Sequence, residues 1–348
     1  MSAISLQDRR ISQWLLVCLS LIFVMVILGG VTRLTGSGLS MVNWHPIHGV
    51  VPPLTSEQWL EEFGRYQQSP EYLVINRDMK VGDFKSIFWF EYAHRMLGRL
   101  IGLVFLLPFL YFWWQNTIKP GLTPKLVIMF FLGGLQGLLG WYMVESGLAG
   151  NPHVSQYRLV AHLLSAILIY AFILWTILDL KQGQQEQSDD PSVVSAWRNG
   201  SLGLLILVLL TIVSGGFVAG LDAGVIYNTF PLMGGEWIPE GISALSPWYL
   251  NLFENKVTVQ FGHRLLAMTT GLLLLGWYIR GRFQFENPVL KRSFKLVGMM
   301  VVIQVLLGVS TLLMQVPVWL AAMHQAGALL LLSAMLINVH TLYSFNEY

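Results

Sequence analysis

Long apolar runs separated by short polar segments make up most of the chain. Four of the runs contain no charged residue and are long enough to cross a bilayer as helices: residues 14–31, 126–144, 159–178 and 201–221. Two further runs, which end at residues 114 and 279, carry charged residues near their start. The last run, 296–346, is uncharged and too long for one span, and Pro317 marks a turn inside it. The pattern predicts eight membrane-spanning helices.

The composition supports a protein whose surface faces lipid. Hydrophobic residues make up 54% of the chain and charged residues 11%, and the mean hydropathy is +0.58. These values are far from those of a soluble domain and predict an all-α integral membrane protein surrounded by membrane lipid. The net charge of +2, without a basic run outside the connections assigned below to the cytoplasm, gives no reason to expect a nucleic-acid partner. A single cysteine, Cys18, excludes an intramolecular disulfide.

The distribution of lysine and arginine predicts the orientation of the helices. Basic residues collect before the first span and in the second, fourth and sixth connections, whereas the third connection, residues 145–157, and the turn at Pro317 contain none. Because basic connections stay in the cytoplasm, both termini are expected there. The apolar run after Arg9 and Arg10 is long for a signal peptide and has no clear cleavage site, so we expect an uncut span.

The two halves of the chain repeat one pattern. Four pairs of matching features show it: Gly29-Gly30 with Gly215-Gly216, Glu91 to Arg95 with Gln260 to Arg264, Gln136 to Gly140 with Gln304 to Gly308, and His162 with His324. The matched features follow one another in the same order in both halves, and the largest change of spacing between them falls in the first outer loop, which is longer in the first half. A unit of four spans keeps its orientation when repeated, so the sequence predicts two parallel-repeated four-helix bundles, residues 1–181 and 196–348, with a polar linker at 182–195.

Four histidines stand at matching places in the two halves, near the predicted outer ends of their helices: His94, His162, His263 and His324. A histidine inside a bilayer is costly unless it is paired or functional, and two facing imidazoles are the ligands of a six-coordinate haem iron. The residues four positions after them are all small, which leaves room for a flat macrocycle: Gly98, Ala166, Ala267 and Ala328. The pattern predicts a haem-binding membrane protein with two sites.

Arginines near these histidines are candidate partners for haem propionates, because a guanidinium can bind a carboxylate through two hydrogen bonds. The candidates are Arg95, Arg99, Arg158 and Arg264. The other histidines lie in predicted loops or at a cytoplasmic helix end, and we assign them no role: His45, His48, His153 and His340.

One difference between the halves points to chemistry. Glu91 stands three residues before His94, whereas Gln260 stands three residues before His263. A carboxylate beside a haem can act as a base, a proton carrier or a partner for a developing cation, and an amide can only form hydrogen bonds. The sequence therefore predicts a catalytic first half and a permanent haem site in the second half.

The chain resembles the haem A synthase family, in the cysteine-poor form shared by mitochondria and many proteobacteria, over nearly its whole length. The motifs that carry the resemblance are GGVTRLT at 29–35, SGLSM at 37–41, EYAHR at 91–95, SGGFVAGLDAG at 214–224 and NTFP at 228–231. Some members of the family have a cysteine pair in the first outer loop. This chain has none there, so a thiol-based step cannot operate.

The resemblance implies an eight-helix enzyme of the bacterial inner membrane that oxidises a ring methyl of haem O to the formyl group of haem A for terminal oxidases. A hydroxyl would be introduced twice, and the resulting gem-diol would lose water. His94 and His162 would hold the substrate haem with Glu91 as the catalytic residue, and His263 and His324 would ligate a haem b that relays electrons. Haem O synthase and terminal oxidase assembly factors are the implied partners.

Two other classes of protein would use parts of the same pattern. A dihaem b-type electron-transfer cytochrome would have the same ligands without needing the difference between Glu91 and Gln260. A haem or small-molecule transporter would have the parallel repeat, but should show broken helices near the middle of the membrane. The candidate ligands lie near one surface instead.

Overall fold

The computed structural model describes residues 5–42, 48–148, 152, 154–181 and 190–345. This part of the chain is helical and contains no named strand. Eight helices have between 26 and 34 residues: α1 (Leu6–Leu34), α4 (Val81–Trp114), α5 (Thr123–Leu148), α6 (Gln156–Lys181), α7 (Pro191–Gly220), α9 (Lys256–Gln284), α10 (Pro288–Leu313) and α11 (Val318–Ser344). The predicted all-α membrane class is confirmed.

Seven of these helices are long and apolar enough to cross a membrane. The eighth predicted span is present as α9, which has 29 residues but is less apolar. Its arginines at 264, 280 and 282 lower its mean hydropathy. Charged groups inside a span are usually kept away from lipid by protein partners, and Arg264 is indeed buried.

The ends of the helices follow local sequence signals. Asp190 caps α7 by accepting a hydrogen bond from the backbone N–H of Ser192 at 2.8 Å, and proline occupies the next position. Residues 191–195 of the predicted linker belong to this helix, and residues 182–189 lie outside the described part. Between α10 and α11, Gln315 and Val316 have positive φ angles of 63° and 58°, and Pro317 is the N-cap that precedes α11, as predicted for that turn.

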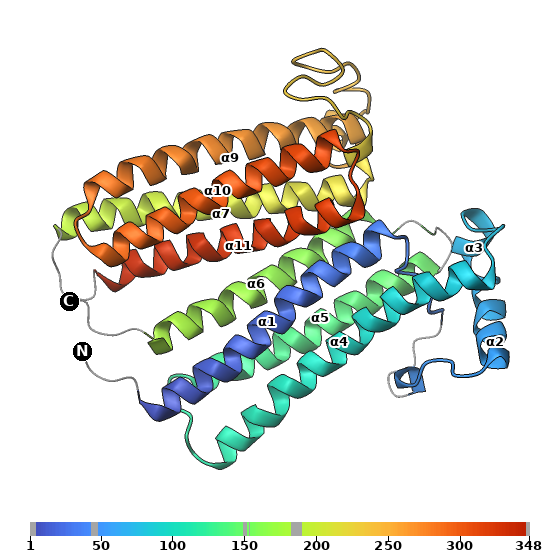
Figure 1. Ribbon diagram of the computed structural model, residues 1–348, viewed down its shortest axis with the longest axis horizontal. Coiled ribbons are helices and arrows are strands. Elements are labelled where there is room, and N and C mark those ends of the chain that lie inside the picture. Colours follow the sequence, from blue (N-terminus) through green and yellow to red (C-terminus); the bar gives the residue numbers. More distant parts are fainter. Residues whose placement is uncertain (1–4, 43–47, 149–151, 153, 182–189, 346–348) are drawn as a thin grey trace. The chain divides into compact units, whose positions relative to one another are not determined.

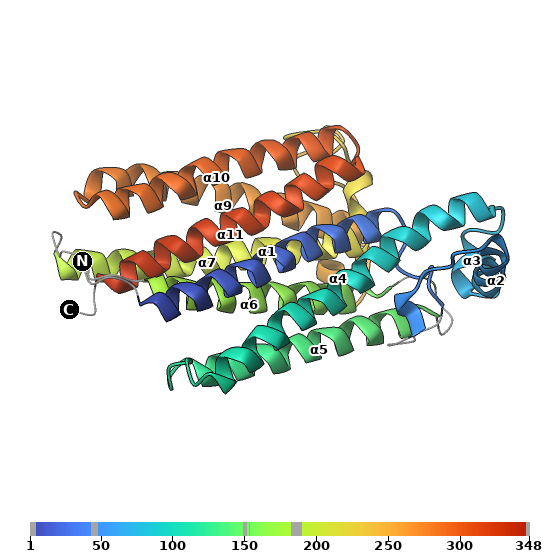
Figure 2. The same ribbon diagram turned by 60° about the horizontal axis from the view of Figure 1, so that its bottom comes forward.

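The chain divides into two compact units, residues 1–19 with 170–348 and residues 20–169. In the unit that contains residues 170–348, α7 and α10 each pack against both α9 and α11, so these four helices form a bundle (Figures 1 and 2). Polar side chains tie the bundle together: Asn338 of α11 accepts from Ser201 of α7 at 2.8 Å and donates to Ser293 of α10 at 2.9 Å. The other unit, residues 20–169, contains the later part of α1, then α4, α5 and the first half of α6, with α4 packed along α5 (Figure 2).

The connection between α1 and α4 contains two short helices that the hydrophobic pattern did not predict, α2 (Ser56–Tyr66) and α3 (Pro70–Val74). An aromatic cluster attaches α2 to the start of α4. Trp59 of α2 packs edge-on against Phe88 at a ring distance of 5.0 Å, and Tyr66 stacks on Phe84 at 5.1 Å. Met41 is buried in the same cluster, so the chain after α1 is held beside α4.

Candidate functional site

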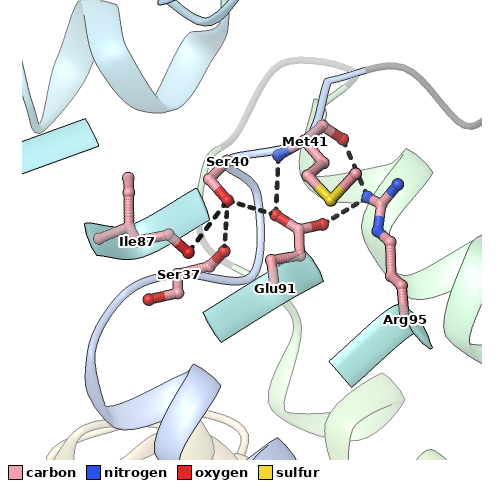
Figure 3. A network of polar contacts seen from close by, with 6 residues as sticks. All are labelled: Ser37, Ser40, Met41, Ile87, Glu91 and Arg95. Atoms are coloured by element: carbon pink, nitrogen blue, oxygen red, sulfur yellow. Dashed lines mark hydrogen bonds and ion pairs between the residues drawn. The ribbon is translucent and has the colours of Figure 1, made fainter. Parts of the chain in front are cut away.

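Glu91 is the centre of a buried polar network on α4 (Figure 3). The residue is only 3% exposed. One carboxylate oxygen, Oε2, accepts hydrogen bonds from Ser40 Oγ at 2.7 Å and from the backbone N–H of Met41 at 2.8 Å. The other oxygen, Oε1, is paired with Arg95 one helical turn later, and Arg95 also donates to the Met41 carbonyl at 2.9 Å. Every donor around this group favours a fixed carboxylate.

At the equivalent position of the second half, the hydrogen bond to the backbone runs in the opposite direction. Gln260, which is 2% exposed, donates its amide hydrogen to the carbonyl of Tyr227 at 2.9 Å. Tyr227 is the counterpart of Met41 in the alignment that matches Gly29 with Gly215. The backbone therefore donates to a carboxylate in the first half, whereas it accepts from an amide in the second half. The predicted difference between the two positions thus extends to their surroundings.

The four histidines form two pairs, one in each compact unit. His94 lies on α4 and His162 on α6, and His263 lies on α9 and His324 on α11. Within each pair the imidazoles are close enough to interact electrostatically. The sequence predicted this pairing.

Each imidazole lies against a glycine of a neighbouring helix. A Cβ atom built on these glycines would come within 2.9–3.2 Å of the ring: Gly29 of α1 for His94, Gly140 of α5 for His162, Gly215 of α7 for His263 and Gly308 of α10 for His324. The missing side chains make space for the rings, and the neighbouring helices can approach closely at these points. These glycines belong to the repeated motifs, which are therefore explained by packing against the histidines.

A hydroxyl group orients the ring of His263. Its Nδ1 lies 2.8 Å from Ser214 Oγ, and the Ser214 hydroxyl donates its hydrogen to the carbonyl of Thr211 at 2.7 Å. Because that hydrogen is used, Oγ accepts from the N–H at Nδ1. The lone pair of the ring then lies on Nε2, where it can ligate iron.

Amide groups contact the rings on α6 and α11 in the same way in both halves. Nε2 of Gln136 lies 3.2 Å from Nδ1 of His162 and donates to the carbonyl of that histidine at 2.9 Å. Gln304 makes the equivalent contacts with His324, at 3.1 and 3.0 Å. Sequence reasoning used these glutamines only to align the halves. Their place in the repeat was the signal that could have identified them as histidine partners.

These residues fit haem better than a bare metal ion. Within the described ranges, no group of three or more His, Cys, Asp or Glu side chains could hold a metal. A pair of imidazoles suits a metal that brings its own equatorial ligands. Arg264 supports the same conclusion: it is 8% exposed, and its Nη1 is buried without a hydrogen-bond partner among the described residues. Such a donor suits a carboxylate of a bound ligand.

The four predicted propionate partners have different surroundings. Arg95 is engaged by Glu91, and Arg264 donates to the backbone carbonyls of Thr229 and Pro231 at 2.7 and 3.0 Å while keeping the buried Nη1. Arg158 lies over the ring of Tyr142 at 4.9 Å. Arg99 contacts Met96 Sδ at 3.6 Å.

Of the histidines given no role, His340 has a structural one. Its Nε2 lies 3.0 Å from Asp179, and its ring packs on Trp175 at 4.9 Å. His45 and His153 lie outside the described residues.

The fold and the site define a class: multi-pass, all-α membrane proteins with a repeated pair of histidines in each half. Residues 12–336 match COX15-CtaA, a family described as cytochrome oxidase assembly protein, and the chain belongs to this family. It is 50% identical to the Heme A synthase of Nitrosospira multiformis over 335 residues, which is 96% of this chain and 94% of that protein. Identity to Heme A synthase COX15 of Homo sapiens is 46% over 339 residues, 94% of this chain and 82% of the human protein. The resemblance read from the motifs is confirmed.

Proposed function

We propose that this protein is a haem A synthase, which oxidises a ring methyl of haem O to the formyl group of haem A for terminal oxidases. The family membership and the names of relatives that cover nearly the whole chain support this function. The observation that carries it is the buried carboxylate of Glu91 one turn from His94, at the position where the second half has Gln260. An electron-transfer cytochrome has no need for that difference.

The two histidine pairs would divide the work. His94 and His162 would hold the haem substrate, and His263 and His324 would ligate a resident haem b. A bound haem b would supply one-electron transfer. Ser214 holds the ring of His263 with Nε2 available, which suits a ligand that stays in place.

Glu91 would act on charge at the reacting carbon. Each of the two hydroxylations removes a hydrogen from the methyl carbon, so a group that takes up a proton or balances positive charge lowers the barrier. Arg95, Ser40 and the backbone N–H of Met41 hold the carboxylate in one position before the reaction. A charge fixed in advance needs no reorganisation when the transition state forms.

The location of the reaction follows from the same proposal. Lysine and arginine collect in the connections that precede α1, α5, α7 and α10, which supports a bacterial inner membrane protein with both termini in the cytoplasm. The histidine ends of the helices would then lie near the outer surface. Haem O synthase would supply the substrate, and terminal oxidase assembly factors would take the product.

The test is to produce the protein together with a haem O synthase and to separate the extracted haems by chromatography. The wild type should make haem A. Glu91→Gln, with the result normalised to bound haem b, should accumulate haem O and lose turnover by on the order of 10² to 10⁴. Near-normal haem A from this variant would remove the catalytic role of Glu91. A wild type that makes no haem A would favour the electron-transfer cytochrome.

A further inference from the structure

His94 differs from the other three paired histidines in its hydrogen bonding. His162, His263 and His324 each have a side-chain partner at Nδ1, at 3.2, 2.8 and 3.1 Å. Neither ring nitrogen of His94 has a hydrogen-bond partner among the described residues. The repeat explains this difference, because Leu28 directly precedes the repeated glycine pair in α1, where α7 has Ser214.

The ring of His94 also faces its glycine differently. A Cβ atom on Gly29 would lie 3.2 Å from Nε2 and 3.6 Å from Cδ2 of that ring. In the other three contacts the nearest ring atom is Cε1, at 2.9–3.2 Å. His94 is therefore rotated relative to its repeat counterpart His263, and no hydrogen bond from the described residues fixes the rotation.

The opposite ligand in the first half is held firmly. Gln136, which contacts Nδ1 of His162, accepts a further hydrogen bond at its Oε1 from Ser165. The second half has Gly327 in place of Ser165, since each stands three positions after the histidine of its helix. The first half thus combines a histidine whose Nδ1 contacts a side-chain amide nitrogen with one whose ring nitrogens have no hydrogen-bond partner among the described residues.

We propose that His94 is the exchangeable ligand of the substrate haem, and that the hydroxyl missing at position 28 makes it so. A substrate must enter and its product must leave, whereas a resident haem must stay. A ligating imidazole that donates its second N–H to a partner, as His263 does to Ser214, is fixed and strengthened as a ligand, and losing such a partner typically costs roughly 10–100-fold in metal affinity. This inference rests on the proposed function, because it takes His94 and His162 as the ligands of the substrate haem.

The test compares haem release from the two sites of the full-length protein in lipid nanodiscs. Haem b is the probe at both histidine pairs, and its transfer to excess apomyoglobin is followed by absorbance. The wild type should release haem in a fast and a slow phase. Leu28→Ser, which gives α1 the hydroxyl of α7, should slow the fast phase roughly tenfold, and Ser214→Ala should accelerate the slow phase by a similar factor. Leu28→Ala, which removes the same bulk without adding a hydroxyl, should not slow release.

His94→Ala and His263→Ala assign the two phases. If the fast phase remains in His94→Ala and in a matching His162→Ala variant, haem does not bind at this pair and the site assignment of the proposed function fails. If the fast phase disappears in both but Leu28→Ser releases haem at the rate of Leu28→Ala, only the exchangeable-ligand proposal is overturned. A single release rate for both pairs in the wild type, with Ser214→Ala unchanged, overturns it as well.

Discussion

Glu91→Gln should destabilise the protein through Arg95, independently of any effect on catalysis. The amide oxygen of the new residue can keep the hydrogen bonds from Ser40 and Met41, so its NH₂ group then faces the Arg95 guanidinium, donor against donor. The Arg95 side chain is 7% exposed and loses its carboxylate partner. Removing one partner of a buried ion pair costs about 3–5 kcal/mol, which in a chain of this size lowers the unfolding midpoint by roughly 4–7 °C.

The double variant Glu91→Gln/Arg95→Met tests that reasoning. Removing both partners leaves no unpaired charge, so its stability should return to within about 1–2 kcal/mol of the wild type. Thermal unfolding in detergent, followed by tryptophan fluorescence, measures the stability of the wild type, the two single variants and the double variant. Losses that simply add in the double variant would refute the argument.

A matched control lies on α2. Glu61 pairs with Arg65 at the same spacing of four residues, but the two side chains are 62% and 42% exposed. Glu61→Gln should change stability by less than about 1 kcal/mol, because solvent screens exposed pairs. A loss as large as that of Glu91→Gln would show that burial is not the cause.

Three further predictions address haem binding, topology and pH. His263→Ala should lose most of a low-spin b-type absorbance spectrum, because six-coordinate haem needs both imidazoles; a full signal would exclude this ligand. Reporter fusions after Gln182 should be cytoplasmic and those after Gly150 external, and the reverse at either site would overturn the orientation. Burial raises the pKa of the Glu71 carboxyl from 4.5 to about 7, against the opposing hydrogen bond from Tyr66. The protonated form is therefore favoured in the folded state, and stability should fall as pH rises from about 4.5 to 7 and then level off. Glu71→Gln should abolish that fall in the unfolding midpoint, and an unchanged pH dependence would contradict the assignment.

The long helices were predictable because hydrophobic runs and charge positions report burial in lipid directly. The turn at Pro317 and the helix that carries Arg264 both form where the pattern placed them. The helices α2 and α3 were not predicted from the hydrophobic pattern, although each begins at a local N-cap signal, Thr55 for α2 and Ser69 for α3. The position of α2 beside α4 depends on aromatic packing that the sequence pattern does not indicate.

The site was predictable only as far as the repeat reached. Matching the halves identified the four histidines and the difference at Glu91, but not the partners of that carboxylate. Ser40 and Met41 are 51 and 50 residues away in the sequence, and only the folded connection brings them to Oε2. Arg95 was expected to meet a propionate. Its spacing of four residues from Glu91 was a local signal for the ion pair that the structure contains.

The glycines of α5 differ in how much space surrounds them, and therefore in how well they should tolerate substitution by alanine. At Gly133, Gly134 and Gly137 an added methyl would meet no atom of the described residues within 4 Å. At Gly140 it would lie 3.2 Å from the His162 ring, which would have to shift by a few tenths of an ångström. Alanine scanning of this one helix should therefore separate these three neutral glycines from Gly140, whose loss disturbs the imidazole, and from Gly147, where the added methyl would lie 2.9 Å from Leu39. Substitutions by small residues should be tolerated at Gly133, Gly134 and Gly137 and disfavoured at Gly140.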